Sequence, residues 1–406
     1  MTAVLQPDTP SGAFRIRKAQ AAATPAPVRP RLDHVDLLRG LVMVIMVLDH
    51  VRAFFTSAHF DPTDLARTDL ALFGTRWITH FCAPVFVFLA GASAWIAGTR
   101  RTRGELSRFL LSRGVWLVFL ELTVITYAWY FTTDFALGLV AQVIWAIGVS
   151  MVVLAGLIHL PRLAVAGFGA ALVLGHNLFD GLAPDRFGAL ADLWRVLHVP
   201  GPLESLPVFM LYPLVPWVGV MALGYAVGPW IFAQDARAGR RLAVAGAVLV
   251  AAFLLLRVLD GYGDHAHRAH EGGAALLLMS FLNTTKYPPS LLYLLMTIGP
   301  ALVALAAFRR ARGPLAGVLV TFGRVPFLFY VAHLYLVHAL AVAAGMAQGF
   351  PASALRTVFL RLPADYGFGL PVVYAVWLGV VALLYPLCRR YAEVKARSRA
   401  WWLSYL

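Results

Sequence analysis

The chain has 406 residues, of which 60% are hydrophobic and only 13% are charged, and its formal net charge at pH 7 is +14. A water-soluble chain of this length carries far more charge, so the composition excludes a soluble globular protein and indicates one that lies in lipid. The basic residues lie in short clusters between apolar runs rather than in one patch, which argues against a nucleic-acid partner.

Ten apolar runs recur along the chain, most of them about 20 residues long, the length that crosses a bilayer core as a helix. A chain in lipid must satisfy its backbone hydrogen bonds internally, and the short strands of a β-barrel would look different. We therefore predict an all-α fold, a polytopic transmembrane helical bundle of about ten spans that form one domain in the lipid bilayer. The runs are 37–56, 77–98, 114–131, 136–158, 163–179, 206–232, 242–259, 289–308, 321–345 and 371–388.

Basic and acidic loops alternate between these runs. Because loops rich in Lys and Arg face the cytoplasm, both termini are predicted to be cytoplasmic, in a multi-pass protein of the cell inner (plasma) membrane. The loop after the run 136–158 holds only Arg162, so a re-entrant pair formed by this run and the next stays an alternative. The basic clusters lie at residues 15–18, 100–103, 237–241, 309–312 and 389–399.

The two ends of the chain differ from its middle. Residues 1–32 hold no apolar stretch and are rich in Ala and Pro, which predicts a disordered cytoplasmic tail. Residues 33–391 form the transmembrane domain, and residues 392–406 a basic cytoplasmic C-terminal tail. The two cysteines, Cys82 and Cys388, lie far apart, so neither a disulfide nor a cysteine-based metal site is indicated.

The first apolar run carries an unusual number of ionisable residues. Helical spacing puts Asp36, Arg39 and His50 on one stripe, with His50 roughly 16 Å from Arg39 along the axis and nearer the outer side. Each ionisable group inside a span costs about 2.5–3.5 kcal/mol on insertion scales, so several on one face indicate a polar cavity. The alternative is that Asp36 and Arg39 anchor the interface, while Asp49 and Arg52 form a pair three residues apart.

Two later segments also interrupt apolar sequence with polar residues. Arg76 and His80 lie four residues apart and could share a face toward the end of the first run, unless Arg76 marks the interface. The segment 283–290 contains two prolines and a lysine, which predicts a broken helix. Because such backbone is tolerated where it lines a cavity, Asn283 and Lys286 are candidate ligand contacts, with an outer-surface loop as the alternative.

Histidines occur in two further settings. Tyr330 and His333 lie three residues apart on one predicted helix face, and His333 is either a binding residue or simply packed and hydrogen-bonded. A flexible, glycine-rich outer loop does not fix ligand geometry, so no metal is predicted for its histidines and acids. That loop contains Asp264, His265, His267, His270 and Glu271. The sequence shows no Walker loop, dinucleotide fingerprint or nucleophile elbow, which excludes the familiar soluble catalytic folds.

Two motifs resemble those of the bacterial relatives of heparan-α-glucosaminide N-acetyltransferase, within the wider class of transmembrane acyltransferases. The sequence VDLLRGL at residues 35–41 is similar to that family's opening aspartate, arginine and glycine motif. Residues 84–93, PVFVFLAGAS, are similar to its proline, phenylalanine and glycine motif, and residues 286–290 form a weaker third match. An arginine followed eleven residues later by a histidine, here Arg39 and His50, resembles other membrane O-acyltransferases of the class.

The resemblance implies a transmembrane acyltransferase-like domain over residues 33–391. Its donor would be acetyl-CoA bound from the cytoplasm, and its acceptor an amino or hydroxyl group of a sugar or glycan at the other side. Acyl transfer needs a general base, and histidine has a suitable pKa. His50 is the first candidate, but by the resemblance His59 lies near the position of the catalytic histidine of the lysosomal enzyme, which has asparagine at the position of His50.

Other residues have roles that follow from this chemistry. Asp49 or Asp36 could orient the imidazole, while Arg39 and the basic cluster at 100–103 could meet the phosphates of CoA. The competing class is a proton-coupled transporter or channel that uses the same Asp, Arg and His residues. A non-catalytic membrane scaffold is a third reading, and whether the protein is a homodimer stays open.

Overall fold

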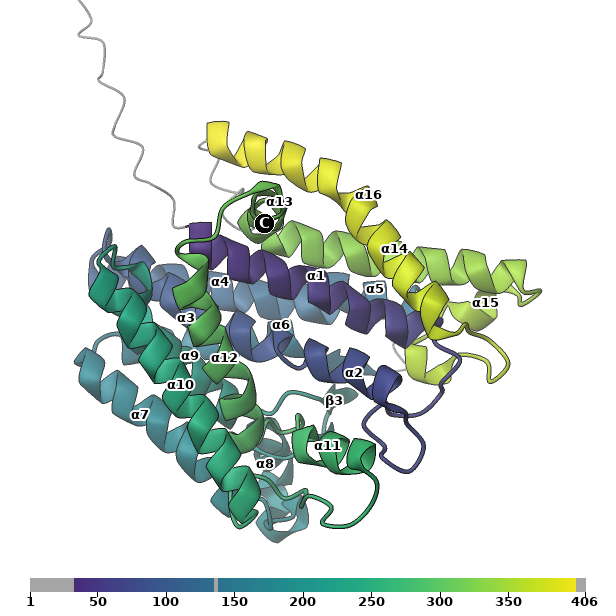
Figure 1. The fold of residues 1–406 in the computed structure, drawn as a ribbon, viewed down its shortest axis with the longest axis horizontal. Helices are drawn as coiled ribbons and strands as arrows, with labels where there is room; N and C mark the ends of the chain where they lie inside the picture. The colour runs from purple at the N-terminus through teal and green to yellow at the C-terminus, as the bar shows by residue number, and fades with distance from the viewer. Residues whose placement is uncertain (1–32, 135–137, 399–406) are drawn as a thin grey trace, which may run out of the picture. The chain divides into compact units, whose positions relative to one another are not determined.

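The computed structural model describes residues 33–134 and 138–398, and the all-α fold is confirmed. The predicted tail at 1–32 lies outside the described residues. A helix occurs in each of the ten predicted runs (Figure 1). The helices are α1 (Asp33–Phe55), α2 (Leu70–Thr79), α3 (Cys82–Gly98), α4 (Arg103–Leu120), α5 (Thr126–Tyr130), α6 (Val143–Leu157), α7 (Arg162–Gly175), α8 (Ala191–Leu197), α9 (Leu214–Phe232), α10 (Ala236–Leu259), α11 (Ala274–Leu282), α12 (Leu291–Phe308), α13 (Pro314–Arg324), α14 (Pro326–Ala347), α15 (Ala352–Leu355) and α16 (Leu370–Arg397).

Within the described residues, eight helical segments are long and apolar enough to cross a bilayer, as expected of a multi-pass membrane protein. The two predicted spans that fall outside this set do so for different reasons. α1 is long enough but carries several charged residues, and α6 has only 15 residues. The count of ten spans and the cytoplasmic termini therefore stay predictions.

α1 lies among other helices of the protein rather than at its edge. It packs against α2, α3, α12, α13, α14 and α16. Ionisable side chains on a helix in this position meet protein groups instead of lipid, which is the setting where membrane proteins tolerate them. The surroundings of α1 thus explain how its charged residues are accommodated.

Pairs of glycines let the most closely packed helices meet backbone to backbone. A Cβ built on Gly323 of α13 would lie 1.8 Å from the Asp36 carbonyl oxygen of α1, and one on Gly40 of α1 would lie 1.8 Å from the Leu319 oxygen. Small residues at helix crossings are typical of membrane proteins, where van der Waals packing drives association. Figure 1 shows α10 beside α12 and α1 against α13. Among the described residues, three glycine pairs each face the other's carbonyl: Gly114 with Gly148, Gly169 with Gly219, and Gly246 with Gly299.

The run predicted at 77–98 is two helices, because the chain turns at His80 and Phe81 between α2 and α3. Pro84 has no N–H to donate to the carbonyl of His80, four residues earlier. The Tyr293 hydroxyl of α12 donates to that carbonyl instead, at 2.8 Å. The carbonyl at the break therefore keeps a hydrogen-bond partner, and the break turns α2 toward the C-terminal half of α1.

Several helices begin where their sequence supplies a cap. Asp69 accepts from the backbone N of Leu72 at 2.8 Å at the start of α2, and Thr102 and Glu105 form a reciprocal capping box at the start of α4. At the start of α12, the Ser290 hydroxyl accepts from the Tyr293 N–H. Such caps satisfy backbone N–H groups that have no partner within the helix.

A small three-stranded sheet of order β1-β3-β2 joins two distant loops. Its strands are β1 (Leu139–Ala141), β2 (Gly201–Pro202) and β3 (Val208–Met210), with β1 parallel and β2 antiparallel to β3. The predicted run 206–232 therefore starts with a strand, and its helix begins at Leu214. Between α7 and β2 lie the 3-10 turns η3 (His176–Phe179) and η4 (Pro184–Leu190) and helix α8.

We expect reporter fusions to reproduce the alternation of basic and acidic loops. Two reporter enzymes are fused at each site, one active only in the cytoplasm and one active only on the outer side. The reporter that is active shows on which side the loop lies. Cytoplasmic sites are expected after Arg103, Arg241, Arg312 and Arg399, and outer sites near Asp134, Asp185 and Gly263. Two adjacent sites on one side would remove a span from the prediction, with α6 and α7 the first to be questioned.

Candidate functional site

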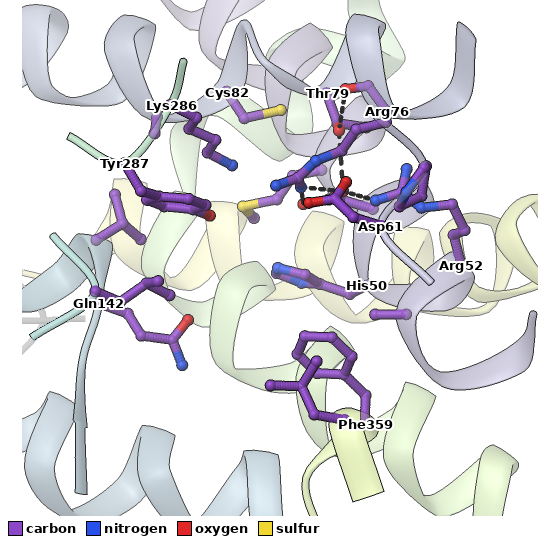
Figure 2. Close-up of a pocket in the computed structure, with 18 of the residues that line it drawn as sticks. His50, Arg52, Asp61, Arg76, Thr79, Cys82, Gln142, Lys286, Tyr287 and Phe359 are labelled. Carbon is purple, nitrogen blue, oxygen red and sulfur yellow. Dashed lines mark hydrogen bonds and ion pairs between the residues drawn. The ribbon is translucent and has the colours of Figure 1, made fainter. Parts of the chain in front are cut away.

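A cavity of about 410 Å³ lies beside the C-terminal half of α1. Segments far apart in sequence line it: α1 and the loop after it, α2, α3, the start of α6, the loop before α9, Lys286 and Tyr287, α14, and the turn η5 (Phe359–Arg361). Figure 2 shows polar and aromatic side chains from these segments facing one space. Its titratable lining residues are Asp49, His50, Arg52, His59, Asp61, Arg76, Cys82, Tyr212, Lys286, Tyr287 and Tyr330.

Asp49 binds two arginines and a threonine. Arg76 of α2 donates to both carboxylate oxygens, at 3.0 and 3.2 Å, and the Thr79 hydroxyl donates to Oδ1 at 2.9 Å. Arg52, three residues along α1, donates to the same oxygen, so the alternative pairing of Asp49 with Arg52 is present. Arg76 thus points at the end of the first run, while His80 is buried and does not line the cavity.

His50 is oriented by His333 rather than by Asp49. His50 Nδ1 lies 2.6 Å from His333 Nε2, and His333 Nδ1 lies 2.8 Å from the Phe329 carbonyl oxygen. A carbonyl only accepts, so we infer that His333 Nδ1 carries its proton and that Nε2 of the neutral ring accepts from His50 Nδ1–H. The Nε2 of a neutral His50 then has a free lone pair, which is the state that a general base needs.

His59, the second candidate base, lines the same cavity. It lies in the exposed loop after α1, and its Nε2 donates to the Tyr366 carbonyl at 2.7 Å. Its Nδ1 is then the nitrogen that could accept a proton. The structure thus brings both candidates into one cavity, with His50 buried on a helix and His59 exposed on a loop.

The predicted break in the helix at 283–290 is present and delivers one of its two candidates to the cavity. Lys286 lines it and is 9% exposed, with Nζ 5.2 Å from the centre of the Tyr287 ring. Burial raises the pKa of the Tyr287 phenol, but the charges of Lys286 and Arg76 outweigh burial and leave that pKa below its usual value. Asn283 does not line the cavity: its amide donates to the Thr63 carbonyl at 3.0 Å.

Asp36 and Arg39 lie away from the cavity, at the other end of α1. Arg39 donates to Asp36 Oδ1 at 2.9 Å, to the Gly323 carbonyl at 3.2 Å and to the Ser93 hydroxyl at 3.2 Å. Its guanidinium therefore ties α1 to α3 and α13, beside the closest approach of α1 and α13. Contact of Arg39 with CoA stays a prediction.

In the loop between α10 and α11, His267 and His270 lie 3.4 and 3.8 Å from Asp260. Over residues 33–134 and 138–398, no three His, Cys, Asp or Glu side chains converge in a way that could hold a metal. Asp264 of the same loop faces the segment 283–290 instead, where it accepts from Thr285 and Ser290.

Sequence reasoning missed several residues at the site. Trp129, Gln142 and Phe359 line the cavity from segments whose spacing gives no link to α1. Glu121 could have been found from the sequence, since a carboxylate inside an apolar run is costly and therefore marks a special position. It is fully buried in the π-helical turn η1 (Glu121–Ile125) and accepts from the Trp145 N–H at 2.9 Å, which caps the start of α6 beside Gln142.

The cavity therefore combines a histidine that can take a proton with an excess of positive charge. Three cations, Arg52, Arg76 and Lys286, and two carboxylates, Asp49 and Asp61, line the cavity, which leaves one net positive charge when the histidines are neutral. A proton acceptor beside a cation suits reactions in which a nucleophile loses a proton and negative charge develops on oxygen.

Comparison with known proteins agrees with this chemistry. A sequence model of the family described as heparan-alpha-glucosaminide N-acetyltransferase, catalytic, matches residues 31–261, which is more than half of the chain. The match includes His50, His59 and Arg76, whereas Lys286 and His333 lie beyond it. No curated protein matches the chain. The resemblance seen in the two motifs is thus confirmed, and the chain belongs to the heparan-alpha-glucosaminide N-acetyltransferase catalytic-domain family.

Proposed function

We propose that the protein transfers an acetyl group from acetyl-CoA to an amino or hydroxyl group of a sugar or glycan acceptor. The observation that carries this proposal is His50, whose inferred tautomer leaves Nε2 free in a cavity of about 410 Å³. Membership in the family supports the choice of acetyl transfer. The aromatic rings of Trp129, Tyr287 and Phe359, beside charged groups, suit a ligand with both apolar and polar faces, as a sugar has.

In the proposed reaction, His50 acts as the general base. The acceptor nitrogen or oxygen attacks the thioester carbonyl carbon and gives its proton to His50 Nε2, while the carbonyl π electrons move to oxygen. When the carbonyl re-forms, the carbon–sulfur bond breaks, and the thiolate of CoA takes the proton from the imidazolium. His333 accepts from His50 Nδ1–H throughout, so it would hold the ring in the orientation that both proton transfers require.

We also propose that donor and acceptor reach the site from opposite sides of the inner membrane. The cavity adjoins the end of α1 that the charge alternation assigns to the outer side, where an acceptor would enter. Arg39 and the basic cluster at 100–103 belong to the opposite end and would meet the phosphates of CoA. A transporter would use the same cavity as a substrate path, but it would not require acetyl-CoA.

The purified protein is expected to bind acetyl-CoA. A ligand that binds only the folded state stabilises it, by about 2.7 kcal/mol at a concentration 100 times the Kd. Thermal unfolding of the detergent-solubilised chain over a wide range of acetyl-CoA concentrations measures this, with an unrelated membrane protein in the same detergent as the control. An unfolding temperature that stays constant, for protein shown to be folded, would count against the acetyltransferase and for the transporter.

A further inference from the structure

Lys286 is the cation of the cavity that has no carboxylate beside it. Arg52 and Arg76 both bind Asp49, whereas no ion pair within 4.0 Å joins the Lys286 ammonium to a carboxylate among the described residues. Its side chain is nevertheless buried, with 9% of the residue exposed. Burying a charge that makes no direct ion pair is costly in free energy, because the charge loses its water. Such a cost is tolerated where the charge meets an anion during function.

A carboxylate on the far side of the segment fixes the backbone that carries Lys286. Asp264 Oδ2 accepts from the Thr285 N–H at 2.8 Å and from the Ser290 hydroxyl at 2.7 Å, and Oδ1 accepts from the Thr285 hydroxyl at 2.6 Å. The Ser290 N–H donates to the Thr285 carbonyl at 2.9 Å and closes the loop. Asp264 thus clasps both ends of a loop whose tip carries Lys286 and Tyr287.

Three more side chains hold this loop from outside the cavity. His176 Nε2 lies 2.9 Å from the Pro289 carbonyl oxygen, and Asn177 accepts from the Leu291 N–H at 2.9 Å. The buried Arg257 donates to the Asn283 carbonyl at 2.8 Å. With its backbone fixed on both flanks, the loop presents the ammonium without the freedom of an ordinary surface lysine, and such preorganisation makes a charge effective in catalysis.

Lys286 and Tyr287 face the space that His50 also faces. Figure 2 shows their side chains entering the cavity from one side while the His50 imidazole enters from another. During acetyl transfer the carbonyl carbon is bonded both to the acceptor atom, which loses a proton, and to the acetyl oxygen, which gains negative charge. A base on one element can take the proton while a cation on another element stabilises the oxygen, and the cavity holds one of each.

We propose that the Lys286 ammonium binds the carbonyl oxygen of the acetyl group and stabilises the oxyanion that forms there, a role that rests on the proposed acetyl transfer. As the acceptor attacks and its proton passes to His50, the carbonyl electron pair becomes the oxyanion beside Lys286. The pair returns when the carbon–sulfur bond breaks, and CoA leaves with the proton from His50. Lys286 keeps its own protons, so atoms and charge balance without another reactant. Asp264 is then a positioning residue that acts through Lys286.

Steady-state kinetics of the full-length protein tests this, with acetyl-CoA as donor and glucosamine as acceptor. Lys286→Met keeps the length and the apolar stem but removes the charge, and it should lower kcat by about 100- to 1,000-fold with little change in either KM. Lys286→Arg should recover part of the loss. A rise in KM with kcat unchanged would overturn the proposal and make Lys286 a group that binds an anion on the substrate.

Asp264→Asn separates positioning from a general structural role. It should lower kcat, while the double variant with Lys286→Met should be no slower than Lys286→Met alone, because both changes remove one interaction. Additive losses would overturn the role of Asp264.

A spectroscopic measurement keeps the proposal falsifiable without turnover. Infrared difference spectra of bound acetyl-CoA labelled with ¹³C at the carbonyl should show a lower carbonyl frequency in the wild type than in Lys286→Met. Equal frequencies would overturn the role of Lys286 while leaving acetyl transfer intact. A wild-type chain that neither binds acetyl-CoA nor acetylates any amine or hydroxyl would refute both the proposed function and this inference.

Discussion

Replacing His50 by alanine should abolish acetyl transfer, with a loss of at least roughly 100-fold, while acetyl-CoA binding and expression stay near normal. The reason is that His50 is the imidazole whose inferred tautomer leaves Nε2 free, held by His333 at 2.6 Å on a helix that fixes its position. Initial rates of acetylation at saturating acetyl-CoA measure the loss, and the thermal shift with acetyl-CoA shows that the donor still binds.

His59→Ala is the matched comparison, because His59 lines the same cavity from a loop. It should cost much less than His50→Ala. Its Nε2 donates to the Tyr366 carbonyl, so the variant loses a contact that helps to hold the loop after α1. If His59→Ala abolishes transfer and His50→Ala does not, the base is His59, and His50 is an orienting or structural group.

Gly323→Ala should leave little folded protein. The added Cβ would lie 1.8 Å from the Asp36 carbonyl oxygen and 2.6 Å from its carbon, both of them backbone atoms of α1 that no side-chain rotation can move. α1 and α13 would have to separate, at a cost that should exceed the roughly 1–3 kcal/mol typical of overpacking in a core. Size-exclusion profiles and thermal unfolding in detergent measure the loss.

Gly317→Ala is the control on the same helix. Apart from its chain neighbours and the backbone of its own helix, no atom lies within 4 Å of a Cβ at this position, so the variant should unfold at or slightly above the wild-type temperature, since alanine favours a helix. Wild-type behaviour of Gly323→Ala would show that α1 and α13 do not approach each other this closely in the folded protein.

The helices could be located from the sequence because lipid imposes a simple rule on composition. Every span must be apolar and must satisfy its own backbone, so each of the ten apolar runs contains a helix. The break between α2 and α3 was harder to place. The single run predicted at 77–98 gave no turn at His80 and Phe81, where the Tyr293 hydroxyl of the distant helix α12 donates to the His80 carbonyl that Pro84 has no N–H to bond.

Part of the site could be predicted for the same local reason. The ionisable stripe of the first helix indicated a polar cavity, and His50 of that stripe lines one. Asp49 and Arg52 line it too, although their spacing had suggested only a separate ion pair. The same reasoning placed Asp36 and Arg39 on the stripe of His50, but the structure leaves them outside the cavity. Spacing along a helix states which side chains share a face, not where along that face a cavity begins.

The sequence by itself determined that this chain is a helical membrane protein, which of its residues carry charge into apolar runs, and its resemblance to an acetyltransferase family. Only the tertiary structure decided that His50 meets His333, 283 residues away, and that Asp264 holds the loop of Lys286. Those pairings depend on how each helix is rotated and how closely the paired glycines let helices approach. Both are set by packing between distant segments, which local spacing does not encode.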